Sequence, residues 1–238
     1  MAKTKVMAKQ TLVLARAGLA EAAEPAYRAQ IEKLVPGIWT LGVRVPKIRT
    51  LAAALAKDKA LDAEAALVVL DTACAGGSRD EILLGVFLLA RFRKALPAIP
   101  WPRIAGWLPA IDNWETCDQL AMTIAAPAVA ANDALLPKLK ALARDKNLWA
   151  RRFVLATAAA LTQKGRGQTD ACLALAALLM ADTEPMVQKA LAWALREASA
   201  DDPAGVAALL QTHRATLAPR VLREAAEKLP ARMRAALL

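Results

Sequence analysis

The chain contains almost no segment that could become a β-strand. A half-buried strand shows apolar and polar residues in alternation over about four to eight positions. The best candidate, "ALVVL" at residues 66–70, is short and embedded in helical sequence. Alanine and leucine dominate the composition while β-branched residues are sparse, which favours helix throughout. We therefore expect an all-α protein.

Short turns rich in Pro, Gly, Asp and Asn divide the chain into a series of helical segments. The expected helices cover roughly residues 7–20, 23–34, 46–57, 61–75, 79–96, 101–108, 113–131, 133–144, 147–163, 168–181, 184–199, 203–213, 218–228 and 230–237. Helices of this length joined by short turns are typical of stacked antiparallel pairs.

Three tryptophans mark a repeat in this pattern. Trp114, Trp149 and Trp193 follow one another at intervals close to the period of about 40 residues in HEAT-type helical repeats. The predicted fold is therefore an α-α superhelix, a solenoid of HEAT-like antiparallel helix pairs with one concave face. We expect a single domain over residues 1–238.

The charge balance indicates the kind of partner. The net charge is +10 and the isoelectric point is about 9.9. A polyanion is the natural partner of such a chain, and nucleic acid is the commonest one. Because many basic proteins never bind nucleic acid, charge alone leaves this open. If the partner is nucleic acid, we expect the concave face to be basic.

The chain lacks the residues that several classes of enzyme need. His213 is the single histidine, which leaves little material for a zinc site or for Ser-His-Asp catalysis. The cysteines, Cys74, Cys117 and Cys172, lie far apart without a CxxC motif. They are expected to be buried free thiols in a reducing compartment. A Gly-rich phosphate loop is also missing. We expect no metal and no cofactor.

The chain also lacks the pattern of a membrane or secreted protein. The N-terminal segment is basic, but Arg16 interrupts its short apolar stretch, which makes a poor signal peptide. The longest uncharged run, residues 119–132, falls short of the ~18 apolar residues of a membrane span. We therefore expect a cytoplasmic protein without membrane contact, and a monomer.

The stretch "PAIDNWETCDQL" at residues 109–120 combines acids with a large aromatic side chain. Trp114 and Asp118 are four residues apart and share one helix face. Asp112 is predicted to be the N-cap, with Glu115 completing a capping box. Asp118 lies beyond the first turn, so capping does not explain it. It is either a partner in a salt bridge to a neighbouring repeat or a functional carboxylate.

The helix at residues 184–199 places a tryptophan among cations. At 100° per residue, Trp193 lies on the side opposite the apolar stripe, between Lys189 and Arg196. The stripe consists of Val187, Leu191, Ala194 and Ala198. An exposed tryptophan flanked by cations suits the face of a sugar or base beside phosphates.

In the helix at residues 147–163, Trp149 shares a face with Phe153 and is expected in the core. Arg151 is expected to be a solvated surface residue. Arg152 is expected to face the concave surface, where it could grip a phosphate or hold Asp118.

Five stretches carry a resemblance to a known family. They are "LGVRVPKIRTLA" (41–52), "IDNWETCDQL" (111–120), "NLWARR" (147–152), "VQKALAWALREAS" (187–199) and "VLREAAEKLP" (221–230). In order and spacing they resemble the AlkD-like family of DNA alkylation repair glycosylases over about residues 25–230. The resemblance implies a HEAT-like superhelix whose concave basic face holds duplex DNA. It also implies hydrolysis of the N-glycosidic bond of purines alkylated at N3 or N7, without base flipping.

The resemblance assigns roles to residues of the matching motifs. Carried over by motif, the catalytic residues are Asp118, Trp114 and Trp193. The predicted DNA-binding residues are Arg152, Arg196, Lys189, Arg44 and Lys47. Some family members use an N-terminal tyrosine near the lesion; by spacing, Lys33 rather than Tyr27 falls near that position.

Two other functions compete with excision. The first is a non-catalytic HEAT-repeat module that binds bent or damaged nucleic acid. A carboxylate beside phosphates weakens simple DNA binding, so the presence of Asp118 favours catalysis over this alternative. The second is a protein–protein scaffold, which would explain a solenoid but not the cationic surroundings of Trp193.

Overall fold

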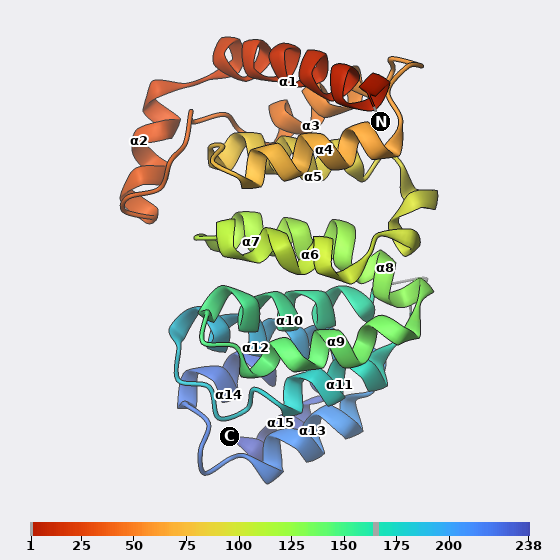
Figure 1. Cartoon of the computed structure of the whole chain (residues 1–238). Helices are drawn as coiled ribbons and strands as arrows, with labels where there is room; N and C mark the ends of the chain where they lie inside the picture. The colour runs from red at the N-terminus through yellow and green to blue at the C-terminus, as the bar shows by residue number, and fades with distance from the viewer. Residues whose placement is uncertain (1, 164–166) are drawn as a thin grey trace. The chain divides into compact units, whose positions relative to one another are not determined.

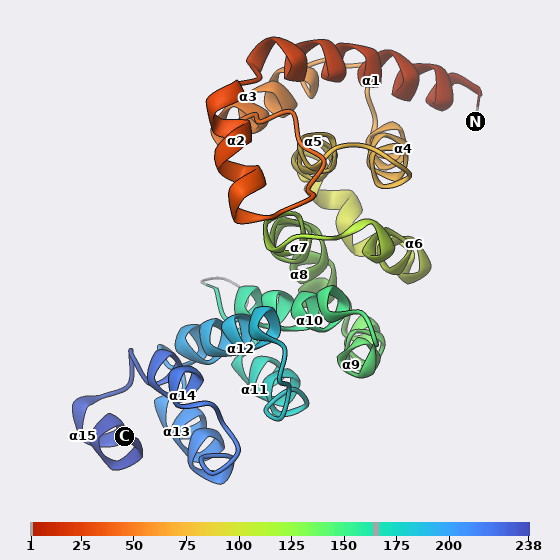
Figure 2. The same ribbon diagram turned by 90° about the vertical axis from the view of Figure 1, so that its left-hand side faces the viewer.

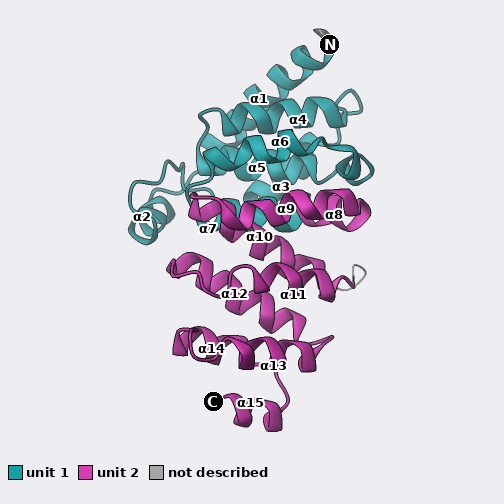
Figure 3. Ribbon diagram, turned by 60° about the horizontal axis from the view of Figure 1, so that its bottom comes forward, with its two compact units in different colours: residues 1–124 teal, residues 125–238 magenta. Residues whose placement is uncertain are grey.

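A computed structural model describes residues 2–163 and 167–238, and every regular element in these ranges is helical. The all-α prediction is therefore confirmed. The chain divides into two compact units, Met1–Ile124 and Ala125–Leu238 (Figure 3). Unit 1 contains α1 (Ala2–Ala22), α2 (Pro25–Leu34), α3 (Val45–Leu55), α4 (Ala63–Cys74), α5 (Arg79–Leu89), α6 (Trp101–Trp107) and α7 (Trp114–Leu120). Unit 2 contains α8 (Ala126–Ala131), α9 (Leu136–Ala141), α10 (Leu148–Leu161), α11 (Thr169–Ala177), α12 (Pro185–Ala198), α13 (Pro203–Thr212), α14 (Pro219–Ala225) and α15 (Ala231–Leu237).

Unit 1 is a stack of packed helices. The row α3, α5 and α7 forms because α5 contacts both α3 and α7, while α1 packs on α3 and α4 (Figure 1). α5 is buried along almost its whole length because its apolar residues cover most of its circumference. In Figure 1, α2 runs crosswise to α1 instead of beside it. The loop from α2 to α3 is held by hydrogen bonds to Asp80 of α5.

Unit 2 repeats the same plan with clearer regularity. Helices α10, α12 and α14 pack one after another, and α11, α13 and α15 form a second row (Figure 2). Phe153 of α10 is completely buried and anchors this core. The predicted apolar stripe of α12 is confirmed, because Val187, Leu191, Ala194 and Ala198 are all buried. Packed pairs repeated along the chain are the architecture of helical-repeat proteins.

One predicted helix is broken in the structure. The run expected at 113–131 consists of α7, a π-helical turn at Ala121–Ala125, and α8. Pro127 is the second residue after this turn, and proline lacks the N–H needed for a regular i→i−4 bond. A wider turn accommodates the missing bond. Likewise, the helix expected at 79–96 ends at Leu89 and continues after a turn as a 3₁₀ segment, Arg93–Ala98, that contains Pro97.

Within the described residues, no single helix is long and apolar enough to cross a membrane. The bent pair of helices at 114–131 and 133–144 has that length and composition, as buried core helices also can. The prediction of one domain over 1–238 stays a prediction.

Candidate functional site

The start of α7 presents an aromatic ring beside a carboxylate. Trp114 is the first residue of the helix and its side chain is 41% exposed. Asp118 follows one turn later on the same face and is half-buried. Leu120 and Ile124 are completely buried and mark the core side of this segment. Much of the large apolar face of Trp114 therefore remains in water.

The predicted cap of α7 is wrong by one residue. Asn113, not Asp112, is the N-cap: its side-chain oxygen accepts hydrogen bonds from the amides of Glu115 and Thr116 at 3.1 and 3.0 Å. Asp112 instead accepts a bond from the Asn113 side-chain nitrogen at 2.8 Å. Both residue types make good caps, so the sequence alone could not separate them. The true cap is buried and fixes the backbone directly before Trp114.

Glu115 takes part in a buried ion cluster instead of a capping box. Arg79, at the start of α5, donates to Glu115 Oε2 through both Nε and Nη2, the first bond being 2.7 Å long. Nη1 of the same guanidinium donates to Asp80 at 2.8 Å. Arg79 and Asp80 are completely buried. Because buried charges need good partners, this cluster fixes α7 against α5 one residue after Trp114.

The same cluster holds the loop between α2 and α3. The Asp80 carboxylate accepts a hydrogen bond from the Thr40 hydroxyl at 2.7 Å. It also accepts hydrogen bonds from the backbone amides of Leu41 and Val43 at 2.7 and 2.9 Å. Arg79 Nη1 donates to the Val43 carbonyl at 3.1 Å. The motif at 41–52 is thus partly structural, since its first residues are ligands of a buried carboxylate.

Gly42 in this loop cannot be replaced without a change of backbone. Its φ is +80°, a conformation that L side chains rarely adopt. A Cβ atom at this position would lie only 2.7 Å from the backbone nitrogen of Arg28 in α2. The glycine allows the loop to pass close to α2 and so brings α2 toward α7.

A pocket of about 190 Å³ lies between α2 and the start of α7. Its lining includes Tyr27 and Trp114. Spacing in the sequence favours Lys33 over Tyr27 as the residue near the site. Lys33 is exposed and does not line this pocket, whereas Tyr27 does. Sequence reasoning missed this because the loop fold at Gly42, which brings α2 next to α7, cannot be seen from spacing.

The two predicted DNA-binding cations of unit 1 lie together. Arg44 and Lys47 each bond to the carboxylate of Glu24, in both cases at 2.9 Å. The Arg44 guanidinium also stacks 4.5 Å from the centroid of the Tyr27 ring. Hydrogen bonds from Lys47 and from Arg44 lower the pKa of Glu24. The carboxylate is therefore ionised at neutral pH and neutralises part of the local positive charge.

A further cation of unit 1 lies next to the predicted carboxylate. Arg49 of α3 donates to the side chain of Gln119 at 3.0 Å, one residue beyond Asp118. The Arg49 guanidinium also stacks on Phe87 at 4.4 Å. Arg49 is exposed, so its charge is accessible. Sequence reasoning missed it because the contact joins residues 70 positions apart.

In unit 2, α12 carries three predicted residues. Trp193 is half-buried, Lys189 is exposed, and Arg196 is half-buried. Arg196 donates to Glu227 at 2.9 Å, and the Glu227 side chain is 63% exposed. An exposed ion pair of this kind contributes about 0–1 kcal/mol. Its arginine can therefore exchange the carboxylate for a phosphate at little cost.

The two arginines of α10 are both held by protein groups. Arg152 is buried, and its Nη1 donates to the Met186 carbonyl of α12 at 2.6 Å. Its predicted contact with DNA stays a prediction. Arg151 was expected to be solvated, and this is wrong: its Nε donates to Asp182 at 2.6 Å. Trp149, expected in the core, is half-buried.

Two of the three thiols, Cys74 and Cys172, offer no nucleophile at neutral pH. Cys117 and Cys172 are buried, Cys74 is half-buried, and none of the three is in a disulfide bond. Burial raises the pKa of Cys172 to about 12, and burial together with the charge of Asp71 raises the pKa of Cys74 to about 12. Since the thiolate is the reactive form, both are inert. In the described part of the chain no cluster of His, Cys, Asp or Glu side chains has the arrangement of a metal site.

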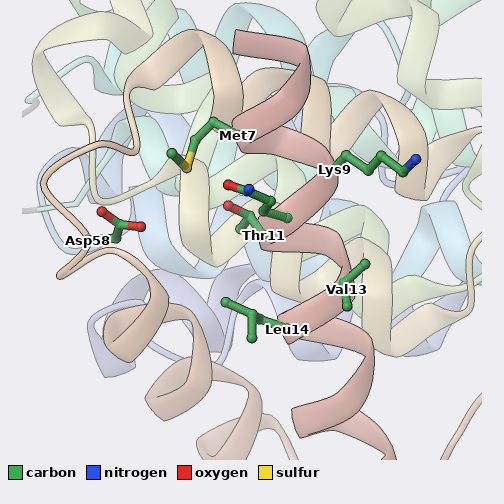
Figure 4. A pocket seen from close by; sticks show the side chains of 7 residues that line it. Met7, Lys9, Thr11, Val13, Leu14 and Asp58 are labelled. Atoms are coloured by element: carbon green, nitrogen blue, oxygen red, sulfur yellow. The ribbon is translucent and has the colours of Figure 1, made fainter. Parts of the chain in front are cut away.

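A larger hollow of about 450 Å³ runs along α1 (Figure 4). Met7, Val13 and Leu14 form its apolar wall, and Asp58 closes one side. None of the residues predicted for catalysis or DNA binding lines it. The candidate site in unit 1 therefore lies at α7 and the α2–α3 loop.

Comparison with known proteins gives a consistent result. The sequence model of a family described as "DNA alkylation repair enzyme" matches residues 15–229. A predicted DNA alkylation repair enzyme from Enterococcus faecalis has a similar structure, with a TM-score of 0.72 and 20% identity over 88% of this chain and 97% of that chain. AlkD2 from Streptococcus mutans is also similar, with a TM-score of 0.57 and 18% identity over 87% and 99% of the two chains. No curated protein matches the sequence.

Proposed function

Because the chain belongs to the family of DNA alkylation repair enzymes, we propose that it is a monofunctional glycosylase. It hydrolyses the N-glycosidic bond of cationic N3- or N7-alkylated purines in duplex DNA, and it does so without flipping the base. A role in DNA alkylation repair follows from membership of this family. The observation that carries the finer proposal is the exposed Trp114 one helical turn from the half-buried Asp118.

The chemistry needs few protein groups. Alkylation at N3 or N7 makes the purine positively charged, so the base is already a good leaving group. When the bond between C1′ and the base nitrogen breaks, its electron pair moves to the base and neutralises that charge. The sugar is left with oxocarbenium character, as in glycoside hydrolysis. Water then adds to C1′ and loses a proton.

Asp118 is the residue we assign to this step. A carboxylate close to C1′ stabilises the cationic sugar and orients the attacking water, whose proton it can accept. In unit 1, Trp114 packs against the sugar, and its ring face stabilises positive charge through the aromatic quadrupole. In unit 2, Trp193 packs on the sugar-phosphate backbone of the duplex. Arg79 and Asn113 hold the start of α7 and thus keep Trp114 and Asp118 in a fixed geometry.

The cations bind the phosphates of the DNA. Arg196, Lys189, Arg44 and Lys47 are half-buried or exposed, so their charges are accessible to a duplex. Arg152 is buried, and its assignment to the DNA phosphates rests on the family motif alone. We further propose that the protein acts in the cytoplasm as a monomer and needs no metal or cofactor.

Release of free base tests this proposal. Purified protein is incubated with duplex DNA that contains N7-methylguanine or 3-methyladenine, and the released base is quantified by chromatography. We expect release of free base and an abasic strand that is not cleaved, because the enzyme is monofunctional. Tight duplex binding without release would instead support a non-catalytic module for bent or damaged nucleic acid.

A further inference from the structure

The outer face of α1 exposes large apolar side chains. Val6, Val13 and Leu14 are 56%, 61% and 60% exposed, whereas the other face of the helix packs on α3, α4 and α5. Outer helices of repeat stacks normally present a polar face, because an apolar one promotes association. The last helix of unit 2, α15, follows this rule: it exposes two arginines, and no large apolar side chain within it is exposed. The apolar face of α1 therefore indicates an interaction surface.

This face borders the hollow of about 450 Å³ beside α1 (Figure 4). Met7, Val13 and Leu14 provide its apolar wall, and Asp58 of the α3–α4 loop closes one side. Pockets that bury whole ligands have volumes of about 300–1,000 Å³, so this hollow can take several apolar side chains. A concave apolar surface is best covered by apolar side chains that protrude from a partner, because both surfaces then leave water.

Lysines lie at the edges of this hollow. Lys9 lines it, and Lys5 lies one turn earlier on the same flank of α1. Lys57 and Lys59 flank Asp58 in the loop, and all four lysines are exposed. The Asp58 carboxylate accepts a backbone amide of its own loop at 2.8 Å. Within the part of the chain that the structure describes, none of the four lysines forms an ion pair. The hollow is therefore apolar inside and positively charged at its edges.

These two properties together select one kind of partner. A second copy of the chain would bring like charges together, since α1 contains four cations and one acid. Duplex DNA would pair with the lysines through its phosphates, but its charged backbone offers no apolar side chains to fill the hollow. Helices that lie on membranes insert protruding apolar side chains into the lipid, whereas the apolar surface here is hollowed. An amphipathic helix with acidic flanks satisfies both the apolar wall and the lysines.

We propose that α1 and the α3–α4 loop form a docking surface for an acidic amphipathic helix of a partner protein. The apolar side chains of that helix enter the hollow beside Val13 and Leu14. Its carboxylates pair with Lys5 and Lys9 along one edge and with the lysines of the loop along the other. This surface is separate from the site at α7, and the proposal does not rest on the glycosylase function.

A synthetic helix tests this directly. The probe is a fluorescein-labelled peptide of about 20 residues, which as a helix matches the length of about 30 Å of α1. It carries leucines at positions i, i+3, i+4 and i+7 and glutamates on both flanks, and a matched neutral peptide carries glutamine in place of every glutamate. Affinities for the full-length protein are measured by fluorescence anisotropy. We expect the acidic peptide to bind about tenfold or more tightly than the neutral one, with a difference that shrinks at high salt.

Matched variants locate the binding surface. Val13→Asp and Leu178→Asp each add one negative charge at an exposed apolar residue, but only Val13 lines the hollow. Val13→Asp should weaken binding of the acidic peptide about tenfold or more, because it places a charge among apolar groups and repels the glutamates. Leu178→Asp should leave it nearly unchanged. Lys9→Gln should likewise weaken binding more than Lys138→Gln, which removes a charge at an exposed position of unit 2. Circular dichroism checks that all four variants fold.

Other results would overturn the proposal. The acidic helix is the wrong partner if it binds no more tightly than the neutral peptide, or if Val13→Asp and Leu178→Asp weaken it equally. A wild-type dimer in sedimentation equilibrium that only Val13→Asp dissociates would assign the face to a second copy. Binding to vesicles of phosphatidylserine and phosphatidylcholine, with no binding of the acidic peptide, would assign it to a membrane. A loss of duplex affinity larger in Val13→Asp than in Leu178→Asp would assign it to DNA.

Discussion

At the scale of single residues, the arginine behind the site explains its geometry. The Arg79 guanidinium bonds to Glu115 in α7, to Asp80 in its own helix and to the Val43 carbonyl in the α2–α3 loop. Nothing in the sequence around Arg79 distinguishes it from the exposed arginines of the chain. Its partners outside its own helix lie 36 residues away on either side, so only the tertiary fold reveals its role.

Replacement of Arg79 should strongly destabilise the protein. Arg79→Ala leaves the Asp80 carboxylate, which is completely buried, without its cationic partner. Removal of one partner of a buried ion pair lowers the free energy of unfolding by about 3–5 kcal/mol. The free energy of unfolding, measured in urea, should fall by about that amount.

Arg103→Ala is the matched control. Arg103 also bonds to two carboxylates, those of Asp71 and Glu64, but this cluster is more exposed. An exposed ion pair contributes about 0–1 kcal/mol, so this variant should lose much less stability. Equal losses in the two variants would contradict the view that burial makes the Arg79 cluster decisive.

Other residue assignments could be made from the sequence. The helical periodicity of α12 separated the buried stripe from Trp193, because one element contains all the necessary information. Arg151 shows the limit of that method. Its partner Asp182 is 31 residues away, and periodicity predicts only which side of a helix a residue faces, not what covers it.

At the scale of elements, the cap of α7 offers a clear test. Asn113→Ala removes the side chain that accepts two amides at the start of the helix. Loss of an N-cap costs about 1 kcal/mol, with a range of roughly 0.5–2. Asp112→Ala removes only the acceptor of one side-chain bond at an exposed residue.

Thermal unfolding of both variants measures the difference. Asn113→Ala should lower the midpoint clearly, and Asp112→Ala should change it little. The reverse order would restore Asp112 as the cap. Since Trp114 follows the cap directly, Asn113→Ala should also weaken DNA binding more than Asp112→Ala does.

Helix boundaries were less predictable than helix positions. The apolar period located α10, α12 and α13 to within a few residues, because each begins and ends with ordinary signals. The π-helical turn at Ala121–Ala125 could not be predicted. Pro127 indicated a disturbance, but whether a proline ends, kinks or widens a helix depends on the packing around it.

At the scale of the whole molecule, the charge of +10 should control DNA binding. Each phosphate that a cation neutralises contributes about 0.9 to the slope of log affinity against log salt. Glu24 competes with phosphates because it bonds to both Arg44 and Lys47. Its lowered pKa keeps it ionised through neutral pH, so this competition persists there.

Glu24→Gln should therefore tighten binding and make it more sensitive to salt. The expected increase in the magnitude of the slope is about 1–2, one for each released cation. Titrations of duplex DNA at several salt concentrations measure it. Glu64→Gln is the control, since Glu64 is an exposed acid whose partner, Arg103, has no predicted role in DNA binding. If both variants change the slope equally, Arg44 and Lys47 are not specific contacts.

The fold class was predictable and the local geometry of the site was not. Composition and the lack of alternating segments excluded strands, and family motifs predicted Trp114 and Asp118 as a pair. The pocket with Tyr27 depends on Gly42, whose positive φ and close approach to Arg28 join α2 to the rest of unit 1. The presence of a glycine in a sequence does not show which other part of the chain its backbone lies against.

The most direct test of the central claim is the rate of base release by Asp118→Asn. Single-turnover release from a duplex with N7-methylguanine is compared among the wild type, this variant and Asp112→Asn, which removes the same charge at an exposed position six residues earlier. Loss of electrostatic catalysis predicts a rate lower by about 100-fold or more for Asp118→Asn, with binding to an abasic duplex preserved and Asp112→Asn unchanged. A rate unchanged by Asp118→Asn would contradict the assignment of this carboxylate to the excision step.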